Sequence, residues 1–153
     1  MLRLPLLVPV LLLVALASMG CDGAGDERDS RPSMDEVLAS LGELPEVERV
    51  VRLTERNDAE ELLGKPRGYD HAAVLVDSRL TCDGPGVECG ALLEVWDDAH
   101  EARARSEYVT ALLDSGVPGL GREHHFLDGP LLLRVTGHLG RSAVAEYAAA
   151  FGA

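Results

Sequence analysis

Two apolar segments joined by a short turn constrain the fold more than any other feature of this sequence. The segments cover about residues 71–79 and 90–96, and both are rich in Val, Leu and Ala. The connection contains Gly84, Pro85 and Gly86, which are residues typical of turns. Strands joined so closely can pair only antiparallel, because a parallel pair needs a crossover of a dozen or more residues. The pattern therefore predicts a β-hairpin.

A second hairpin is predicted nearer the C-terminus. Segments 123–127 and 131–136 flank Asp128 and Gly129, and Asp-Gly between apolar runs is a strong hairpin signal. Residues 47–54 alternate between apolar and polar side chains, so they are predicted to form a further strand.

Four segments have the pattern of helices. Ser33 with Glu36, and Asp98 with Glu101, match N-terminal capping patterns. The predicted helices cover about 33–44, 57–63, 99–114 and 142–151. In the third helix we expect five side chains to face inward: Ala102, Tyr108, Val109, Leu112 and Leu113.

These elements predict an α+β fold. The hairpins favour an antiparallel sheet of about four or five strands, with the helices packed on one face. The β-α-β-β-α-β order in the middle of the chain is that of the ferredoxin-like split fold, which is one candidate topology. The chain is of the length of one domain, which we assign to 33–153.

The first 20 residues have the features of an export signal. Arg3 supplies an early positive charge, residues 4–17 are apolar and uncharged, and residues 18–20 are mostly small. The apolar run is short for a membrane span, which takes about 20 residues. We therefore assign 1–20 to a signal peptide.

Cys21 follows the leader directly. The sequence Ser18-Met19-Gly20-Cys21 resembles bacterial lipoprotein precursors, although Ser18 and Met19 replace the Leu and small residue usual in that family. The resemblance implies that Cys21 carries lipid, and that the protein is anchored to the cell membrane on its extracytoplasmic face. Residues 22–32 are rich in Gly and Asp, so 21–32 is predicted to be a lipidated Cys and flexible tether.

Two other outcomes remain for the leader. Cleavage by the ordinary secretory peptidase gives a secreted protein with a free thiol at Cys21. A leader that stays attached gives a membrane-anchoring helix. All three outcomes place the body of the protein outside the cytoplasm.

Cys82 and Cys89 are the other two cysteines of the chain. Export into an oxidising compartment favours pairing of such thiols. The six residues between them do not match the Cys-x-x-Cys motif of redox pairs, and no His lies among them. The spacing thus predicts a structural disulfide, with a redox pair or half of a metal site as alternatives.

The charge balance narrows the partners. The chain has 14 Lys and Arg against 26 Asp and Glu, a formal net charge of −12. This argues against nucleic acid, whose binding requires basic surfaces. The membrane, through Cys21, and an unidentified protein or small molecule remain as partners.

Glu123-His124-His125 is the densest ionisable cluster. Adjacent residues of a strand point to opposite faces, so His124 and His125 do not easily bind one metal ion. Neither a His-Glu-x-x-His helix nor a Gly-x-Ser-x-Gly turn occurs in the sequence. We expect no catalytic, metal or cofactor residues. The three other histidines are distant in sequence: His71, His100 and His138.

The section 90–136 supports the predicted location and fold. It contains Glu94-Val95-Trp96-Asp97-Asp98, an Ala- and Arg-rich helix ending in Tyr108-Val109, and the strand Gly129-Pro130-Leu131-Leu132-Leu133-Arg134-Val135. In these motifs it is similar to small exported lipoproteins of actinobacteria. The resemblance implies location and fold, and it brings no catalytic residue with it.

The sequence thus predicts a non-enzymatic, lipid-anchored binding or accessory module. Such a module is expected to present an uncovered apolar patch or sheet edge. One alternative is an envelope hydrolase or metal-dependent enzyme that uses His124 or His125 with a nearby acid. The other is a structural spacer lipoprotein.

Overall fold

A computed structural model describes residues 31–116 and 121–153. The predicted signal peptide and Cys21 lie outside these residues. The elements follow in the order α1 (Met34–Gly42), β1 (Val47–Arg52), β2 (His71–Asp77), the 3-10 helix η2 (Val87–Cys89), β3 (Gly90–Val95), α2 (Ala99–Asp114), β4 (Glu123–Asp128), β5 (Leu131–Thr136) and α3 (Arg141–Phe151).

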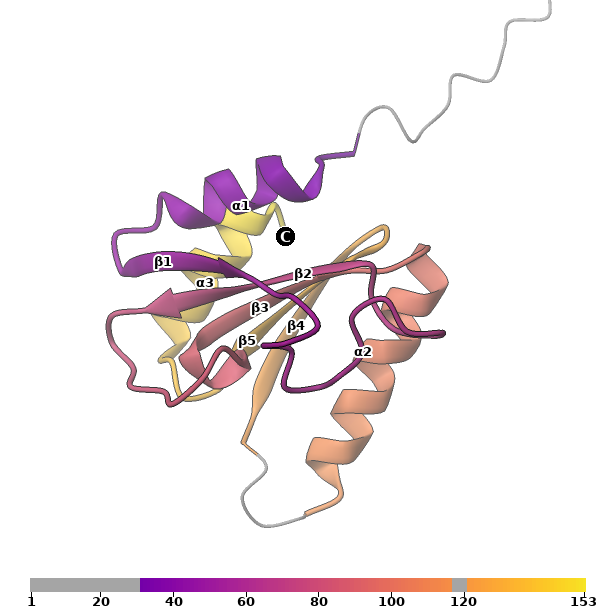
Figure 1. Cartoon of the computed structure of the whole chain (residues 1–153). Helices are drawn as coiled ribbons and strands as arrows, with labels where there is room; N and C mark the ends of the chain where they lie inside the picture. The colour runs from indigo at the N-terminus through magenta and orange to yellow at the C-terminus, as the bar shows by residue number, and fades with distance from the viewer. Residues whose placement is uncertain (1–30, 117–120) are drawn as a thin grey trace, which may run out of the picture.

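Five strands form one antiparallel sheet in the order β1-β2-β3-β5-β4 (Figure 1). Both predicted hairpins are confirmed, β2 with β3 and β4 with β5. In the second hairpin Gly129 takes a positive φ of 55°, which a two-residue hairpin turn requires and which glycine adopts without strain. The α+β class predicted from the sequence is confirmed.

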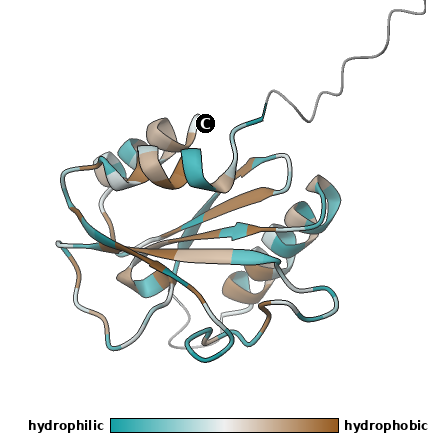
Figure 2. Ribbon diagram, turned by 45° about the horizontal axis from the view of Figure 1, so that its top comes forward, coloured by the Kyte–Doolittle hydropathy of each residue, from teal (hydrophilic) through white to brown (hydrophobic). Residues whose placement is uncertain are grey.

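The three helices do not share one face of the sheet, so that part of the prediction is wrong. The central strands are apolar along most of their length (Figure 2). Because successive residues of a strand point to opposite faces, both faces of the sheet need cover. Ala73 and Leu75 of β2 pack in a core with α1 and α3. Ala72 and Val74 pack in a second core with Ala102 of α2. The sheet is therefore the middle layer of three.

The ferredoxin-like topology is also wrong. That fold needs a helix between its first two strands, which then run parallel. Here β1 and β2 are antiparallel neighbours, and the predicted helix over 57–63 is a series of turns. Glu61 has a φ of 55°, outside the helical region, and the carboxylate of Asp58 accepts the backbone N–H groups of Leu62 and Leu63 at 2.8 Å. This turn segment forms one wall of the site described below.

The remaining local predictions are largely confirmed. Ser33 and Glu36 form a capping box at α1, and the side chain of Asp98 caps α2. Cys82 and Cys89 form a disulfide. Within the described ranges, no helix has the length and apolar character needed to cross a membrane.

Candidate functional site

A buried cluster of charges lies between α2 and the sheet. Its centre is Arg134 of β5, which is only 3% exposed. Arg134 donates to Glu94 of β3 at 2.8 Å, to Glu123 of β4 at 2.7 Å, and to Glu60 of the 54–69 segment at 2.7 Å. These contacts join three parts of the chain through one guanidinium group, which presents its donors in a fixed planar arrangement.

Glu94 is the most deeply buried acid of this cluster, with none of its surface exposed. Burial raises the pKa of Glu94, whereas the positive charges of Arg134 and Arg105 oppose that rise. The indole Nε1 of Trp96 donates to the same carboxyl group at 2.9 Å. Because a buried carboxylate is costly unless it is paired, the positions of Arg134 and Trp96 are tied to that of Glu94.

Glu123 extends the cluster toward α2. Burial opposes its ionisation, but hydrogen bonds from His125 and Arg134 prevail and lower the pKa of Glu123 to about 2. An ionised carboxylate only accepts, so the His125 Nε2, 3.1 Å away, donates to it. In the neutral ring Nδ1 then accepts from the Ser106 hydroxyl at 2.9 Å. The Ser106–His125–Glu123 chain thus links the middle of α2 to β4.

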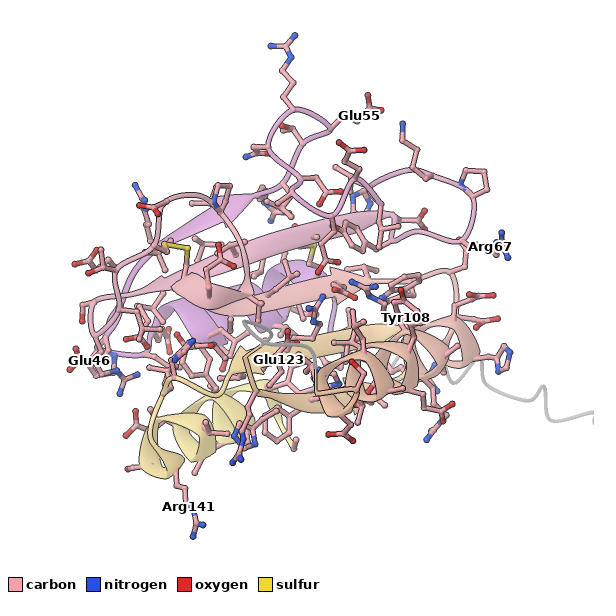
Figure 3. The ribbon with its side chains drawn as sticks, turned by 90° about the horizontal axis from the view of Figure 1, so that it is seen from below. Glu46, Glu55, Arg67, Tyr108, Glu123 and Arg141 are labelled. Atoms are coloured by element: carbon pink, nitrogen blue, oxygen red, sulfur yellow. A yellow bond between two sulfur atoms is a disulfide. The ribbon has the colours of Figure 1, made fainter. Side chains whose placement is uncertain are left out.

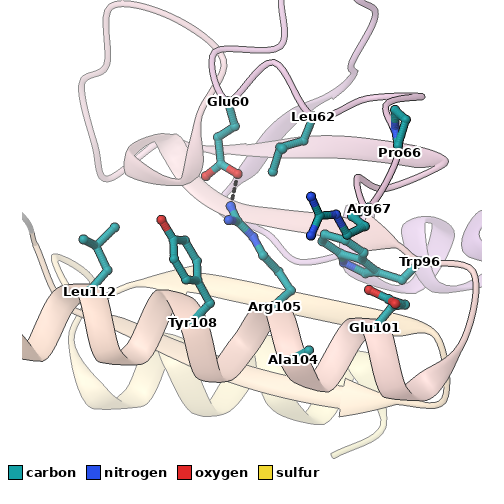
Figure 4. A pocket seen from close by; sticks show the side chains of 10 residues that line it. All are labelled: Glu60, Leu62, Pro66, Arg67, Trp96, Glu101, Ala104, Arg105, Tyr108 and Leu112. Atoms are coloured by element: carbon teal, nitrogen blue, oxygen red, sulfur yellow. Dashed lines mark hydrogen bonds and ion pairs between the residues drawn. The ribbon is translucent and has the colours of Figure 1, made fainter.

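An open groove of about 810 Å³ lies beside this cluster. Helix α2 forms one wall and the 54–69 segment forms the other, and Trp96 belongs both to the core under α2 and to the groove lining (Figure 4). The groove is lined by Glu60, Leu62, Pro66, Arg67, Trp96, Glu101, Ala104, Arg105, Tyr108 and Leu112.

The 54–69 wall has no helix or strand but is well fixed. Asp58, which is 6% exposed, accepts a hydrogen bond from the hydroxyl of Tyr69 as well as backbone N–H groups of its own turn. Tyr69 is fully buried and packs edge-to-face on Trp96, with ring centroids 5.8 Å apart. The loop is therefore held from inside, which leaves its outer side chains free to face the groove.

Two arginines reach the groove from opposite walls (Figure 4). Arg105 of α2 forms an ion pair with Glu60, and its buried Nε lies 3.8 Å from the Glu94 Oε2, within ion-pair distance but too far for a hydrogen bond. Arg67 forms no ion pair with a described residue and has a φ of 64°. A positive φ is uncommon outside glycine and costs on the order of 1 kcal/mol. Figure 3 shows Arg67 and Tyr108 at the same end of the molecule.

Two apolar side chains of α2 differ from their prediction. Tyr108 and Leu112 were expected to face inward, yet they are 61% and 41% exposed. Ala102 and Val109 are buried as expected. The inward face of α2 is narrow, so these two side chains are enough to cover it. Tyr108 and Leu112 lie on the neighbouring face, where they line the groove.

The predicted histidines do not come together. His124 and His125 point to opposite faces of β4, and only His125 joins the charged cluster. His71, His100 and His138 are exposed. In the ranges 31–116 and 121–153, no three His, Cys, Asp or Glu side chains are grouped to hold a metal ion.

Sequence reasoning missed Glu94 and Arg134. Each interrupts an apolar strand, Glu94 within 90–95 and Arg134 within 131–136. A charge inside such a strand has to be paired when the strand is central, and that signal is visible in the sequence. The partners are not, because Glu60 and Arg105 come from distant segments.

No protein-family model matches the chain, and neither a curated protein nor a solved structure matches it.

Proposed function

We propose that this protein is an exported, lipid-anchored envelope protein that binds a ligand, without catalysis, in the groove between α2 and the 54–69 segment. One observation carries the proposal. Among the described residues only three large hydrophobic side chains are exposed, Val50, Tyr108 and Leu112. Two of these three line the same groove. Exposed apolar groups gathered in a concave surface are typical of binding sites.

The construction of the groove supports a binding role. Its walls are fixed before any ligand arrives, α2 by the Ser106–His125 contact and the loop by Asp58 and Tyr69. A site that is already ordered loses little conformational entropy on binding. The strained backbone of Arg67 is of the kind found at functional sites.

The groove can be tested in the full-length protein by placing a photo-crosslinking amino acid at Tyr108. We expect a saturable crosslink in intact cells that is lost in Leu112→Glu. Val50→Glu is the matched control, because Val50 is the one large exposed hydrophobic residue of the described ranges that lies outside the groove. No crosslink above background would favour the spacer alternative, and equal loss in both variants would exclude a specific role for the groove.

The location forms a separate part of the proposal. Support comes from the leader, from Cys21 and from the Cys82–Cys89 disulfide, since disulfides persist in oxidising compartments. We expect Cys21→Ser to move the protein from the membrane fraction to the soluble exported fraction. Retention of Cys21→Ser on membranes would contradict lipid anchoring. Release of the protein that keeps Cys21 would indicate the secreted alternative.

The Ser106–His125–Glu123 chain favours a second candidate, an envelope hydrolase. A nucleophile bonded to a base, which is oriented by an acid, is the arrangement that activates serine. However, Ser106 lies in the middle of α2, where backbone N–H groups are used within the helix and are not free to stabilise an oxyanion.

A fluorophosphonate probe decides between the two functions, because an activated serine displaces its fluoride and keeps the phosphonyl group. We expect no labelling of Ser106 at probe concentrations that label serine hydrolases. Stoichiometric labelling that disappears in Ser106→Ala but persists in the exposed Ser115→Ala control would establish the hydrolase instead.

A further inference from the structure

We propose that the ligand of the groove is an extended peptide segment in which an acidic residue precedes a large apolar residue by three positions. This inference rests on the proposed binding function and specifies its ligand. It follows from the charges, the apolar surface and the length of the groove.

The charge that the groove offers to a ligand is a guanidinium. Glu60 is an acid of the lining, but its two carboxylate oxygens are occupied by Arg105 and Arg134. Arg67 has no ion pair with a described residue, whereas Arg105 is paired with Glu60, and its buried Nε lies 3.8 Å from the Glu94 Oε2. A ligand carboxylate between Arg67 and Arg105 supplies the ion-pair partner that Arg67 lacks among the described residues, and it accepts the charge-assisted hydrogen bonds that Arg forms best. Glu101 is the one lining acid that opposes such a ligand.

The apolar part of the groove lies farther along α2. Tyr108 and Leu112 follow Arg105 by three and seven residues. At about 1.5 Å per residue, Leu112 lies roughly 10 Å from Arg105 along the helix axis. An extended peptide advances about 3.3 Å per residue, so three residues cover that distance. This spacing places the apolar side chain of the ligand beside Tyr108 and Leu112 when its carboxylate is beside Arg105.

The open form of the groove favours a peptide over a fatty acid or another small amphiphile. Small-molecule sites enclose most of the ligand surface, whereas this groove leaves Tyr108 61% exposed. The lining of α2 runs from Glu101 to Leu112, about 16 Å at the same helical rise, which accommodates roughly five extended residues. A peptide can occupy such a groove and keep its outer backbone in water.

The test is a titration of the purified exported protein carrying Cys21→Ser, with the disulfide intact, followed by NMR. The probe is acetyl-Gly-Glu-Ala-Ala-Phe-Gly-amide. Its controls carry Gln or Lys in place of Glu, or have Glu and Phe adjacent. We expect the Glu peptide to shift groove signals and to bind at least fivefold more tightly than each control. Arg67→Gln should abolish the preference for Glu over Gln, and Glu101→Gln should strengthen binding of the Glu peptide about twofold or more.

Arg49→Gln is the matched control for Arg67→Gln, because Arg49 is an exposed arginine of β1 outside this groove. Tighter binding of the Gln or Lys peptide overturns the acidic specificity, and so does unchanged discrimination in Arg67→Gln. Absence of peptide binding, with the Tyr108 crosslink retained, overturns this inference alone. Absence of both overturns the groove as a binding site.

Discussion

The two faces of the sheet are built differently at their centres. Toward α1 and α3, strands β3 and β5 present Leu93, Leu133 and Val135, which are fully buried. Toward α2, the same two strands present Glu94 and Arg134, equally buried but charged. The first face needs only apolar area and a fitting shape. The second needs particular partners at particular positions, because each buried charge has to be compensated.

This difference explains why the groove lies on the α2 side. Arg134 and Glu94 fix Glu60 of the loop and Arg105 of α2, which are groove residues. The apolar face includes a buried acid of its own, Asp77, but that residue lies at the end of β2 and is satisfied by Arg79 and Tyr147. The charged centre thus positions residues of the groove, whereas the apolar centre mainly stabilises the fold.

Among substitutions on the two faces, Arg134→Leu should cause the largest loss in the free energy of unfolding. Removal of the guanidinium leaves Glu94 and Glu123 buried without their main partner, and breaking a buried ion pair costs about 3–5 kcal/mol. Urea unfolding measures the loss. The double variant Arg134→Leu with Glu94→Leu should recover part of it. A single variant that loses less than about 1 kcal/mol would show that the cluster is not a stabilising unit.

Leu133→Ala is the counterpart on the apolar face. Leu133 is fully buried, and shortening such a side chain costs about 2–5 kcal/mol through lost burial and the remaining cavity. Leu133→Met, which keeps the volume, should cost less than about 1.5 kcal/mol. If Met were as damaging as Ala in urea unfolding, this face would depend on side-chain identity as strongly as the α2 face does.

Glu123→Gln tests the charged face through pH. The pKa of Glu123 is lowered from the usual 4.5 to about 2, so its ionised form stabilises the folded state fully above pH 4.5. That contribution is lost as pH falls from 4.5 toward 2. The stability difference between the unmodified protein and Glu123→Gln should therefore be largest near neutral pH and shrink below 4.5. A constant difference from pH 7 to pH 2.5, in thermal unfolding, would contradict the ionised state assigned to Glu123.

The smallest effect on stability is expected for Leu112→Glu. Leu112 is 41% exposed, and substitutions at exposed sites usually change stability by less than about 0.5 kcal/mol. Thermal unfolding of Leu112→Glu should match that of Val50→Glu. A loss above 1 kcal/mol in Leu112→Glu alone would mean that Leu112 packs the fold, and that its place in the groove is secondary.

The sequence was sufficient to predict elements whose signals are local. The bounds of 99–114 and 131–136 are the same in prediction and structure, because a capping residue, a helical period and a hairpin turn lie within each segment or beside it. The layer arrangement was not predictable in this way. Successive apolar residues of β2 and β3 point to alternate faces, so both faces of the sheet carry apolar side chains. Which helix covers which face depends on the strand order.

The candidate site depended even more on distant contacts. Glu60 and Arg134 are 74 residues apart in the chain, and Arg105 and Glu60 are 45 apart. The 54–69 segment has a helical pattern around Asn57 and Glu60, yet Asp58 binds the backbone of its own turn instead. The Asp58 side chain competes with helix formation for the backbone N–H groups of this segment. Residue composition does not indicate which of the two prevails.

The contact between α1 and α3 has a consequence for how the groove is presented. The Ser40 hydroxyl donates to the Ala150 carbonyl at 2.8 Å, and both ends of the described fold enter or leave through these two helices (Figure 1). Any attachment through either end therefore joins the molecule on one face of the sheet, while the groove opens on the other. Fused to a surface, a tag or another domain at either terminus, the protein keeps the groove side of its sheet accessible to the surroundings.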